Sequence, residues 1–339
     1  MNRASGHSRD IKPNFVASIR VVTGVSMDNN TSSSGVQQQP NYGVKALSKV
    51  LPVAIAITLI NGLVFVIFYR RKALRTTSNY LLLSLAICDF LTGTINIPYF
   101  ILFSSYVEPL ATSAIFFYGM YILHNLMAVS AAYHILAITA EKYLAIVRPL
   151  RHYLVTKKTV WKILVGIWIT SAFIAVIPIS WNESKSKVTW YIIHATLCIV
   201  LVFLVPYTFM IYAFTAMFKV IVKRKRPSIN RKSSRLQRKN ISDQKCVLVF
   251  ALMAAIFVVC WLPYFSLTLA TYVKRSLELK SGSSALMEKA VEVIVIIRYM
   301  TSITNPLLYT FFKRDFRLAL RKRPLKYGST TIPLRSTSK

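Results

Sequence analysis

The sequence predicts an all-α membrane protein, a seven-transmembrane helix bundle with a short amphipathic eighth helix. Three observations support this prediction: seven long apolar stretches, very little charge inside them, and an uneven distribution of charge between them. Of the 339 residues, 54% are hydrophobic and 16% are charged. A soluble globular protein has about 25% charged residues, so the composition favours a chain embedded in lipid.

Each of the seven stretches is long enough to cross a bilayer, since a spanning helix needs about 20 mostly apolar residues. Five contain no charged residue, and the other two contain only Asp89 and Arg298, respectively. No internal repeat relates them, which argues against transporters built from inverted repeats. The stretches are residues 50–69, 79–107, 109–140, 163–182, 188–218, 246–273 and 293–312.

The basic residues predict how the chain is oriented. The chain has 43 Lys and Arg against 11 Asp and Glu, and 30 of the 43 lie in the four segments that would share one side of the membrane. The positive-inside rule places that side in the cytoplasm. We therefore expect a multi-pass plasma-membrane protein with an extracellular N-terminus and a cytoplasmic C-terminus, and no nucleic-acid partner.

Four regions follow from this topology. We expect a disordered extracellular tail over 1–46, the helix bundle over 47–312, a basic amphipathic helix on the membrane surface over 313–323, and a cytoplasmic tail over 324–339. The first region has no apolar core typical of a cleavable signal peptide. Glycosylation sequons on the extracellular side predict sugar attachment at Asn29, Asn30 and Asn182.

Asp89 is the most informative polar residue within the spans, because a carboxylate in the membrane must pair, bind a cation or be protonated. Asn61, Ser302 and Asn305 are expected to share a polar cluster with it. Two interpretations stay open: a water-filled core that binds Na⁺ at Asp89, or a structural hydrogen-bond network without an ion. No other cofactor is expected.

Several short motifs follow one another in a fixed order along the seven spans. They are Asn61, the LAxxD run that ends at Asp89, Glu141-Lys142-Tyr143, Trp168 with Pro178, Pro206, Phe257-x-x-Cys260-Trp261-x-Pro263, Asn305-Pro306-x-x-Tyr309 and Phe316-Arg317. In this order and spacing the chain resembles the rhodopsin-like family of G-protein-coupled receptors from about residue 47 to 323.

The resemblance implies an extracellular ligand and a heterotrimeric G protein as partners, with arrestin, receptor kinases and membrane lipid as further ones. It implies that an activation switch is formed by Glu141, Lys142, Tyr143, Asp243, Phe257, Trp261, Pro263 and Tyr309. Lys142 stands where the family has arginine, and lysine lacks the planar, two-pronged donor. We expect a Lys142–Asp243 pair that locks the helices together less firmly. For Trp261, plain core packing is the alternative to a switch role.

The expected ligand site departs from that of amine receptors in the family, which carry an aspartate where this chain has His124. No retinal-linking lysine is present either, since Tyr299 occupies that position. Arg298 is expected to meet an anionic ligand, to pair with Asp89 or to bind backbone carbonyls. The expected site is aromatic and suits a small or lipid-like ligand. It comprises His124, Asn125, Tyr121, Tyr99, Tyr264, Phe265, Thr268, Arg298 and Tyr299.

Other classes of protein fit less well. An enzyme would need HExxH, GxSxG or clustered histidines, and none is present, so no enzymatic activity is expected. A channel or transporter of seven spans is the alternative function. Phe117 replaces the cysteine that the family uses for its extracellular disulfide, and the four cysteines are expected to be free thiols. Receptors without that cysteine occur among melanocortin, adenosine, lipid and cannabinoid receptors.

Overall fold

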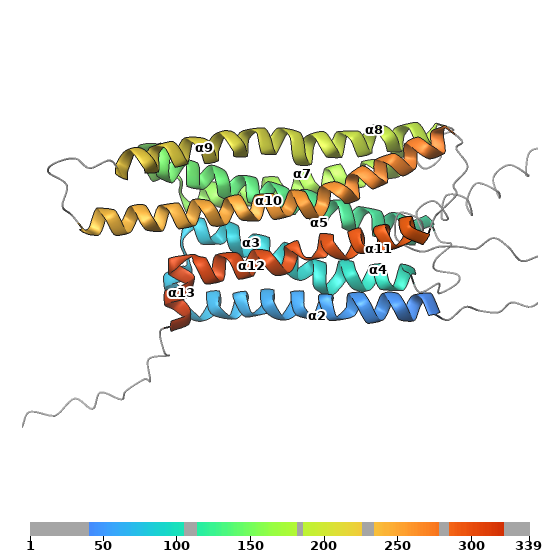
Figure 1. Ribbon diagram of the computed structural model, residues 1–339, viewed down its shortest axis with the longest axis horizontal. Helices are drawn as coiled ribbons and strands as arrows, with labels where there is room; N and C mark the ends of the chain where they lie inside the picture. Colours follow the sequence, from blue (N-terminus) through green and yellow to red (C-terminus); the bar gives the residue numbers. More distant parts are fainter. Residues whose placement is uncertain (1–40, 105–113, 182–185, 226–233, 278–284, 322–339) are drawn as a thin grey trace, which may run out of the picture.

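The computed structural model confirms the predicted bundle over the residues that it describes, 41–104, 114–181, 186–225, 234–277 and 285–321. Every described element is helical, and the long helices run side by side along one axis (Figure 1). Seven segments are long and apolar enough to cross a membrane: Ser48–Arg70, Thr77–Leu102, Tyr118–Val147, Lys157–Trp181, Val188–Arg224, Asn240–Ser276 and Lys289–Phe312.

Several spans consist of more than one helical element. In chain order the described elements are α2 (Asn41–Arg70), η1 (Lys72–Leu74), α3 (Thr77–Leu91), η2 (Thr92–Asn96), α4 (Ile97–Ser104), α5 (Ala114–Val147), α6 (Pro149–Tyr153), α7 (Lys157–Val176), η4 (Ile177–Trp181), α8 (Lys187–Ile199), η5 (Val200–Leu204), α9 (Val205–Lys225), α10 (Ser234–Ser276), α11 (Ala285–Tyr299), α12 (Thr301–Phe312) and α13 (Arg314–Arg321).

Helix α5 lies at the centre of the bundle and packs against α3, α7, α9 and α10. In its most apolar window 67% of the residues are buried, against 33% in the spans of α2 and α7. The outer helices present large apolar side chains at the surface, among them Leu59, Ile169 and Val259. Such an apolar surface is unfavourable in water and suits a hydrocarbon solvent.

Proline explains the two π-helical turns found in the described part of the bundle. The turn η2 ends two residues before Pro98, and η5 ends two residues before Pro206. A proline has no N–H to donate to the preceding turn, and a widened turn is one way in which a helix accommodates the lost bond. The turn η2 matters for the candidate site, because Asn96 is its last residue.

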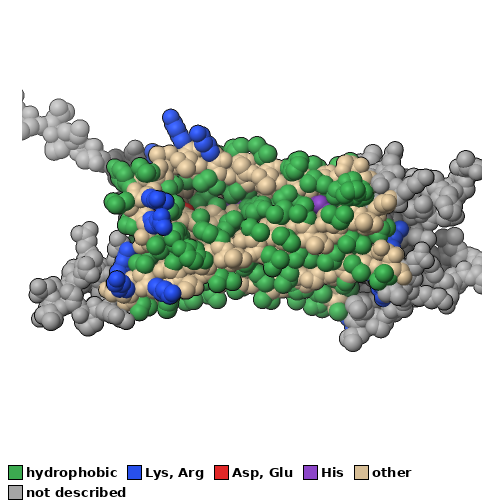
Figure 2. All heavy atoms as spheres, turned by 90° about the horizontal axis from the view of Figure 1, so that it is seen from above, with side chains coloured by type: hydrophobic (Ala, Val, Ile, Leu, Met, Phe, Trp, Pro, Cys, Tyr) green, Lys and Arg blue, Asp and Glu red, His purple; other side chains and the backbone are tan. Residues whose placement is uncertain are grey.

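The two ends of the bundle differ in charge. Figure 2 shows Lys and Arg side chains gathered mostly at the end that carries α13, with hydrophobic side chains covering the face between the ends. Helix α13 lies across this end (Figure 1), and Phe316, which is buried, packs on the ring of Tyr309 with 5.3 Å between centroids. The predicted amphipathic eighth helix is thus present, with Arg317 and Leu318 exposed.

Gly93 marks a close approach between η2 and α2. A Cβ atom at Gly93 would lie 2.7 Å from Thr58 Oγ1 and 3.0 Å from the carbonyl oxygen of Ala54. The backbone oxygen has little freedom to move away. At Gly166, on the outer face of α7, a Cβ would meet nothing within 4 Å.

We predict that Gly93→Ala destabilises the protein by about 1–3 kcal/mol, the usual cost of overpacking, and lowers its melting temperature in detergent. Gly166→Ala is the matched control, and it should keep or raise the melting temperature because alanine favours helix over glycine. Equal melting temperatures for the two variants would contradict the close approach.

Candidate functional site

Arg298, one residue before the end of α11, is fully buried, at 0% exposure. Its Nη2 lies 2.5 Å from His124 Nε2 and 3.0 Å from the Tyr299 hydroxyl. A guanidinium only donates hydrogen bonds, so Nε2 of His124 accepts. The imidazole proton then sits on Nδ1, which donates to the Met120 carbonyl at 2.9 Å. His124 is therefore a neutral acceptor in this arrangement.

Aromatic rings surround the guanidinium. Its carbon lies 4.2 Å from the ring centre of Tyr264, 4.8 Å from that of Tyr299 and 5.6 Å from that of Phe100. Such cation–π contacts are worth about 0.5–2 kcal/mol each, less than the several kcal/mol that burying an unpaired charge costs. Nε and Nη1 have no hydrogen-bond partner, and among the described residues no carboxylate pairs with Arg298.

Of the nine residues expected to form the ligand site, the structure gathers four: His124, Tyr264, Arg298 and Tyr299. A fifth, Tyr121, lies in a neighbouring aromatic cluster, where its hydroxyl is 3.0 Å from His194 Nδ1. The other expected partner of Arg298, Asp89, is bonded elsewhere, to Asn305. The interpretation in which Arg298 pairs with Asp89 is therefore wrong for this structure.

The remaining four residues make other contacts. Asn125 and Thr268 each donate to the carbonyl four residues earlier in their own helix, at 2.9 Å and 2.8 Å. The Tyr99 hydroxyl donates to the Phe116 carbonyl at 3.1 Å. Phe265 packs on Phe203, with 5.5 Å between ring centres. Two of the four contact Tyr264 of the Arg298 cluster: Thr268 donates to its carbonyl, and the Phe265 ring lies edge-on to the Tyr264 ring with 5.8 Å between centres.

Phe100 belongs to the cluster and was not expected there. Asn96, four residues earlier, is fully buried, and both atoms of its amide group have no partner. Periodicity alone gives no reason to single out Phe100 within an apolar run. An asparagine inside a predicted span is a detectable signal, because an unsatisfied amide in hydrocarbon is costly.

Hydrogen bonds connect Arg298 to the tryptophan of α10. The Thr301 hydroxyl donates to the Arg298 carbonyl at 2.9 Å, and Trp261 Nε1 donates to the Thr301 oxygen at 3.1 Å. Trp261 stacks on Phe257 at 5.9 Å and lies two residues before Pro263, the proline inside α10. Two hydrogen bonds thus link the Arg298 backbone to the tryptophan next to the proline of α10.

The Asp89 cluster lies further toward the α13 end, and the structure brings its predicted members together. Asn305 Nδ2 donates to Asp89 Oδ2 at 3.2 Å, and the Ser302 side chain also hydrogen-bonds to Asp89. Asn61 Nδ2 donates to the Ser302 carbonyl at 2.9 Å. The Asn61 Oδ1 and the Tyr309 hydroxyl are buried without a partner. These are oxygen atoms, the ligand type that alkali cations prefer.

At the α13 end, Lys142 is held by residues that sequence reasoning did not expect. Its Nζ lies 2.8 Å from Glu141 Oε2 and donates to Ser78 at 2.6 Å. Glu141 also accepts from His152 Nε2 at 2.9 Å.

The predicted Lys142–Asp243 pair is wrong for this structure, because Glu141 takes up the ammonium and Asp243 lies 3.8 Å from Arg224. Tyr143 points elsewhere, with its hydroxyl 3.5 Å from that of Tyr212.

A cavity of about 370 Å³ opens beside Lys142 at this end. Lys313, which follows α12, donates to Asn79 Oδ1 and lines the same cavity. Burial lowers the pKa of Lys313 to about 8, with repulsion from Lys142 as the second cause. The cavity is lined by Lys142, Ile241, Ser242, Asp243, Lys245, Cys246, Phe312, Lys313, Asp315 and Arg317.

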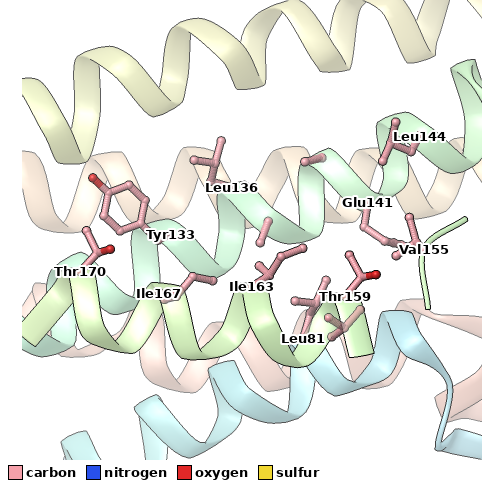
Figure 3. A pocket seen from close by; sticks show the side chains of 14 residues that line it. Leu81, Tyr133, Leu136, Glu141, Leu144, Val155, Thr159, Ile163, Ile167 and Thr170 are labelled. Carbon is pink, nitrogen blue, oxygen red and sulfur yellow. The ribbon is translucent and has the colours of Figure 1, made fainter. Parts of the chain in front are cut away.

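A second hollow, of about 500 Å³, lies between α5 and α7 (Figure 3). Leucine, isoleucine and valine side chains dominate its walls, and Glu141 lies at one end beside Val155. It has no cluster of polar groups that could select a polar ligand. The Arg298 cluster and the cavity beside Lys142 are therefore the better candidates for function.

The described residues contain no group of three His, Cys, Asp or Glu side chains that could hold a metal ion. All four cysteines are free thiols, three of them buried, which confirms the expectation from their positions. The predicted glycosylation sites Asn29, Asn30 and Asn182 lie outside the described residues, as does the tail beyond α13.

Comparison with known proteins agrees with the seven-helix bundle over most of the chain. Residues 60–309 match the family described as 7 transmembrane receptor (rhodopsin family). The histamine H2 receptor of Canis lupus familiaris is 28% identical over 335 residues, covering 92% of this chain and 89% of that receptor.

Two further relatives are also amine receptors by name. The histamine H2 receptor of Homo sapiens is 28% identical, covering 80% of this chain and 77% of that receptor. The octopamine receptor beta-2R of Chilo suppressalis is 24% identical with the same coverage. None of these names belongs to the group of receptors that the missing cysteine suggested.

The lowered pKa of Lys313 gives a pH-dependent stability. The Lys313 ammonium keeps its proton up to about pH 10.5 in the unfolded chain, but only up to about pH 8 in the folded chain. Between these values the unfolded state binds more protons, so stability rises with pH. We predict that the melting temperature of the wild type rises between pH 7 and pH 9.5, and that Lys313→Gln removes most of this rise.

Lys162→Gln serves as the control, because Lys162 is exposed on α7. Its melting temperature should follow the wild-type pH profile. A wild-type profile that stays flat or falls over this interval would contradict the burial of the Lys313 ammonium.

Proposed function

Because the chain belongs to the rhodopsin family of seven-transmembrane receptors, we propose that it binds an extracellular ligand at the Arg298 cluster and activates a heterotrimeric G protein. The hydrogen-bonded path from Arg298 through Thr301 to Trp261 is the observation that carries this proposal. A ligand that moves Arg298 would move the tryptophan beside the α10 bend. The family match leaves the alternative of a channel or transporter without support.

In this proposal the α13 end faces the cytoplasm. The segments that meet there carry 30 of the 43 basic residues of the chain, and such residues are retained on the cytoplasmic side during membrane insertion. The opposite end, with the sequons at Asn29, Asn30 and Asn182, is then extracellular, and those asparagines are glycosylated. The exposed Arg317 of α13 contributes to holding this helix against anionic lipid.

The site is unsuited to the amines for which the relatives are named. Where amine receptors of the family carry an aspartate, this chain has the neutral His124, with the Arg298 cation 2.5 Å from it. Two like charges 4 Å apart repel by about 4 kcal/mol at an effective dielectric constant of 20. An ammonium ligand therefore meets repulsion at the point where an aspartate would attract it.

The cavity beside Lys142 is the proposed entry for the G protein, and later for arrestin and receptor kinases. Lys142 is one of four basic residues that line this cavity, and in the proposed inactive state it is held by Glu141 and Ser78. An arginine would form two parallel bonds to Glu141, whereas the lysine ammonium is a single charge on a flexible stem. The inactive state is therefore held less firmly than in relatives with arginine.

Purified protein in nanodiscs should accelerate nucleotide exchange on a G protein relative to empty nanodiscs, without added ligand. We predict that Lys142→Arg lowers this basal exchange severalfold, because arginine holds Glu141 more firmly. The matched control is Lys219→Arg, a substitution of an exposed lysine on the same half of the bundle.

Exchange no faster than with empty nanodiscs, for both the wild type and Lys142→Arg and across the main G-protein classes, would contradict the proposed coupling. Basal exchange that Lys142→Arg leaves unchanged would contradict the weak-lock explanation alone.

The Asp89 cluster is proposed to bind Na⁺. The supporting observation is that a carboxylate and two buried oxygen atoms without partners, those of Asn61 and Tyr309, belong to one polar region with Ser302. The residues present fit a small hard cation, which prefers oxygen ligands. Bound Na⁺ would stabilise the inactive arrangement of α3 and α12.

We predict that replacing choline by Na⁺ at constant ionic strength raises the melting temperature of the wild type, since an ion that binds only the folded state stabilises it. Asp89→Asn should remove the effect. The same shift in Asp89→Asn as in the wild type would exclude this cluster as the sodium site.

A further inference from the structure

We propose that the ligand is an organic carboxylate, an apolar or aromatic body with one negative charge, and that Arg298 binds the carboxylate. This inference rests on the proposed receptor function and adds the chemical class of the ligand. The site offers a cation to an anionic ligand, whereas an amine site offers an anion to a cationic ligand. Three observations, on hydrogen bonding, on charge balance and on access, support it independently of one another.

The first observation is the unused hydrogen-bonding capacity of the guanidinium. Nη2 is occupied by His124 and Tyr299, whereas the Nε and Nη1 donors have no partner although the side chain is fully buried. Buried polar groups are normally satisfied by the protein, by water or by a ligand. A carboxylate oxygen accepts strongly from a guanidinium and would satisfy these donors.

The second observation is that the described part of the chain supplies no anion to Arg298. Asp89 is engaged by Asn305 and Ser302. Glu292, six residues before Arg298, forms an ion pair with Lys49. His124 is a neutral acceptor. The positive charge is therefore balanced only by the faces of three rings, and an anionic ligand would complete the balance.

A second unsatisfied group reinforces this inference. Asn96 lies four residues before Phe100, whose ring faces the guanidinium, and its amide nitrogen and oxygen are both without a partner at 0% exposure. One turn of helix separates the two side chains along the same span. An arginine with a nearby amide donor suits a singly charged carboxylate, whereas a phosphate dianion would call for further cations.

The third observation is a helix face with polar side chains that leads from Arg298 toward the end of the bundle opposite α13. Along α10, Tyr264, Thr268, Tyr272 and Arg275 follow at intervals of four, four and three residues and so share one helix face. Arg275, at the outer end of this face, provides a second positive charge that attracts an anion. Tyr264 is 9% exposed, against 0% for Tyr299 and 3% for Phe100, so we expect the ligand to reach Arg298 past Tyr264.

The experiment compares matched acids and amines on the purified full-length receptor in nanodiscs. The probes are 4-hydroxyphenylacetate and imidazole-4-acetate, with tyramine and histamine as amines that carry the same rings, at constant chloride and ionic strength. We expect at least one acid to raise the melting temperature with a saturable dependence on concentration, and neither amine to do so. Arg298→Gln should abolish the shift, and Arg298→Lys should retain part of it because the charge remains.

Arg298→Gln is expected to fold, because it removes a buried charge that lacks an internal partner; its ligand-free melting temperature and surface expression check this. If it does not fold, the acid affinity of Arg298→Lys is compared with that of the wild type. Equal affinities overturn the proposal. A shift with the amines, a shift with neither acid, or an equal acid shift in Arg298→Gln also overturns it.

Nucleotide exchange on the G protein separates this proposal from the receptor function. Exchange stimulated by an amine would keep the receptor function and contradict the carboxylate site. Acid binding that depends on Arg298 but leaves exchange unchanged would support the carboxylate site and contradict its coupling to the G protein.

Discussion

A positive charge buried without an internal counter-charge is the constraint on which this site depends. Arg298 lies at 0% exposure, contacts three aromatic rings and donates to a neutral histidine. In a medium of low dielectric constant such an arrangement costs several kcal/mol unless an anion completes it. Natural proteins keep costly groups of this kind where function requires them, and the position of Arg298 within a membrane span makes this explanation stronger.

The surrounding structure connects Arg298 to the tryptophan and proline of α10. The Arg298 carbonyl is joined through Thr301 to Trp261, which packs on Phe257 beside the proline of α10. Toward the α13 end of the bundle, Lys142 of α5 is held by Glu141 and Ser78 next to a cavity whose lining includes four basic residues. In the proposed function, anion binding at Arg298 and release of Lys142 belong to one conformational change of the bundle.

The sequence predicted the architecture well because hydrocarbon imposes a length and a composition on every span, and because motifs such as Asn305-Pro306 fix the register of each helix. It predicted the individual contacts less well. Asn125 and Thr268 turn to their own helix backbones, a competition that residue type alone does not decide.

Lys142 could pair with Glu141, its neighbour in sequence, or with Asp243, which is distant in sequence. The sequence pattern does not decide between these partners, and in the structure Lys142 pairs with Glu141. The contacts of Phe100 with Arg298 and of Ser78 with Lys142 were identified only from the packing of the helices. The π turn η2, which sets the register of Asn96 and Phe100, follows from Pro98 only in retrospect.

The most direct test of the unpaired charge needs no ligand. His124→Glu would supply a carboxylate beside Arg298, and His124→Gln is the neutral variant of the same size. We predict that the glutamate variant has a higher melting temperature than the glutamine variant, because an internal anion satisfies the guanidinium. A glutamate variant that melts at the same or a lower temperature would contradict the claim that Arg298 is a cation in need of a counter-charge.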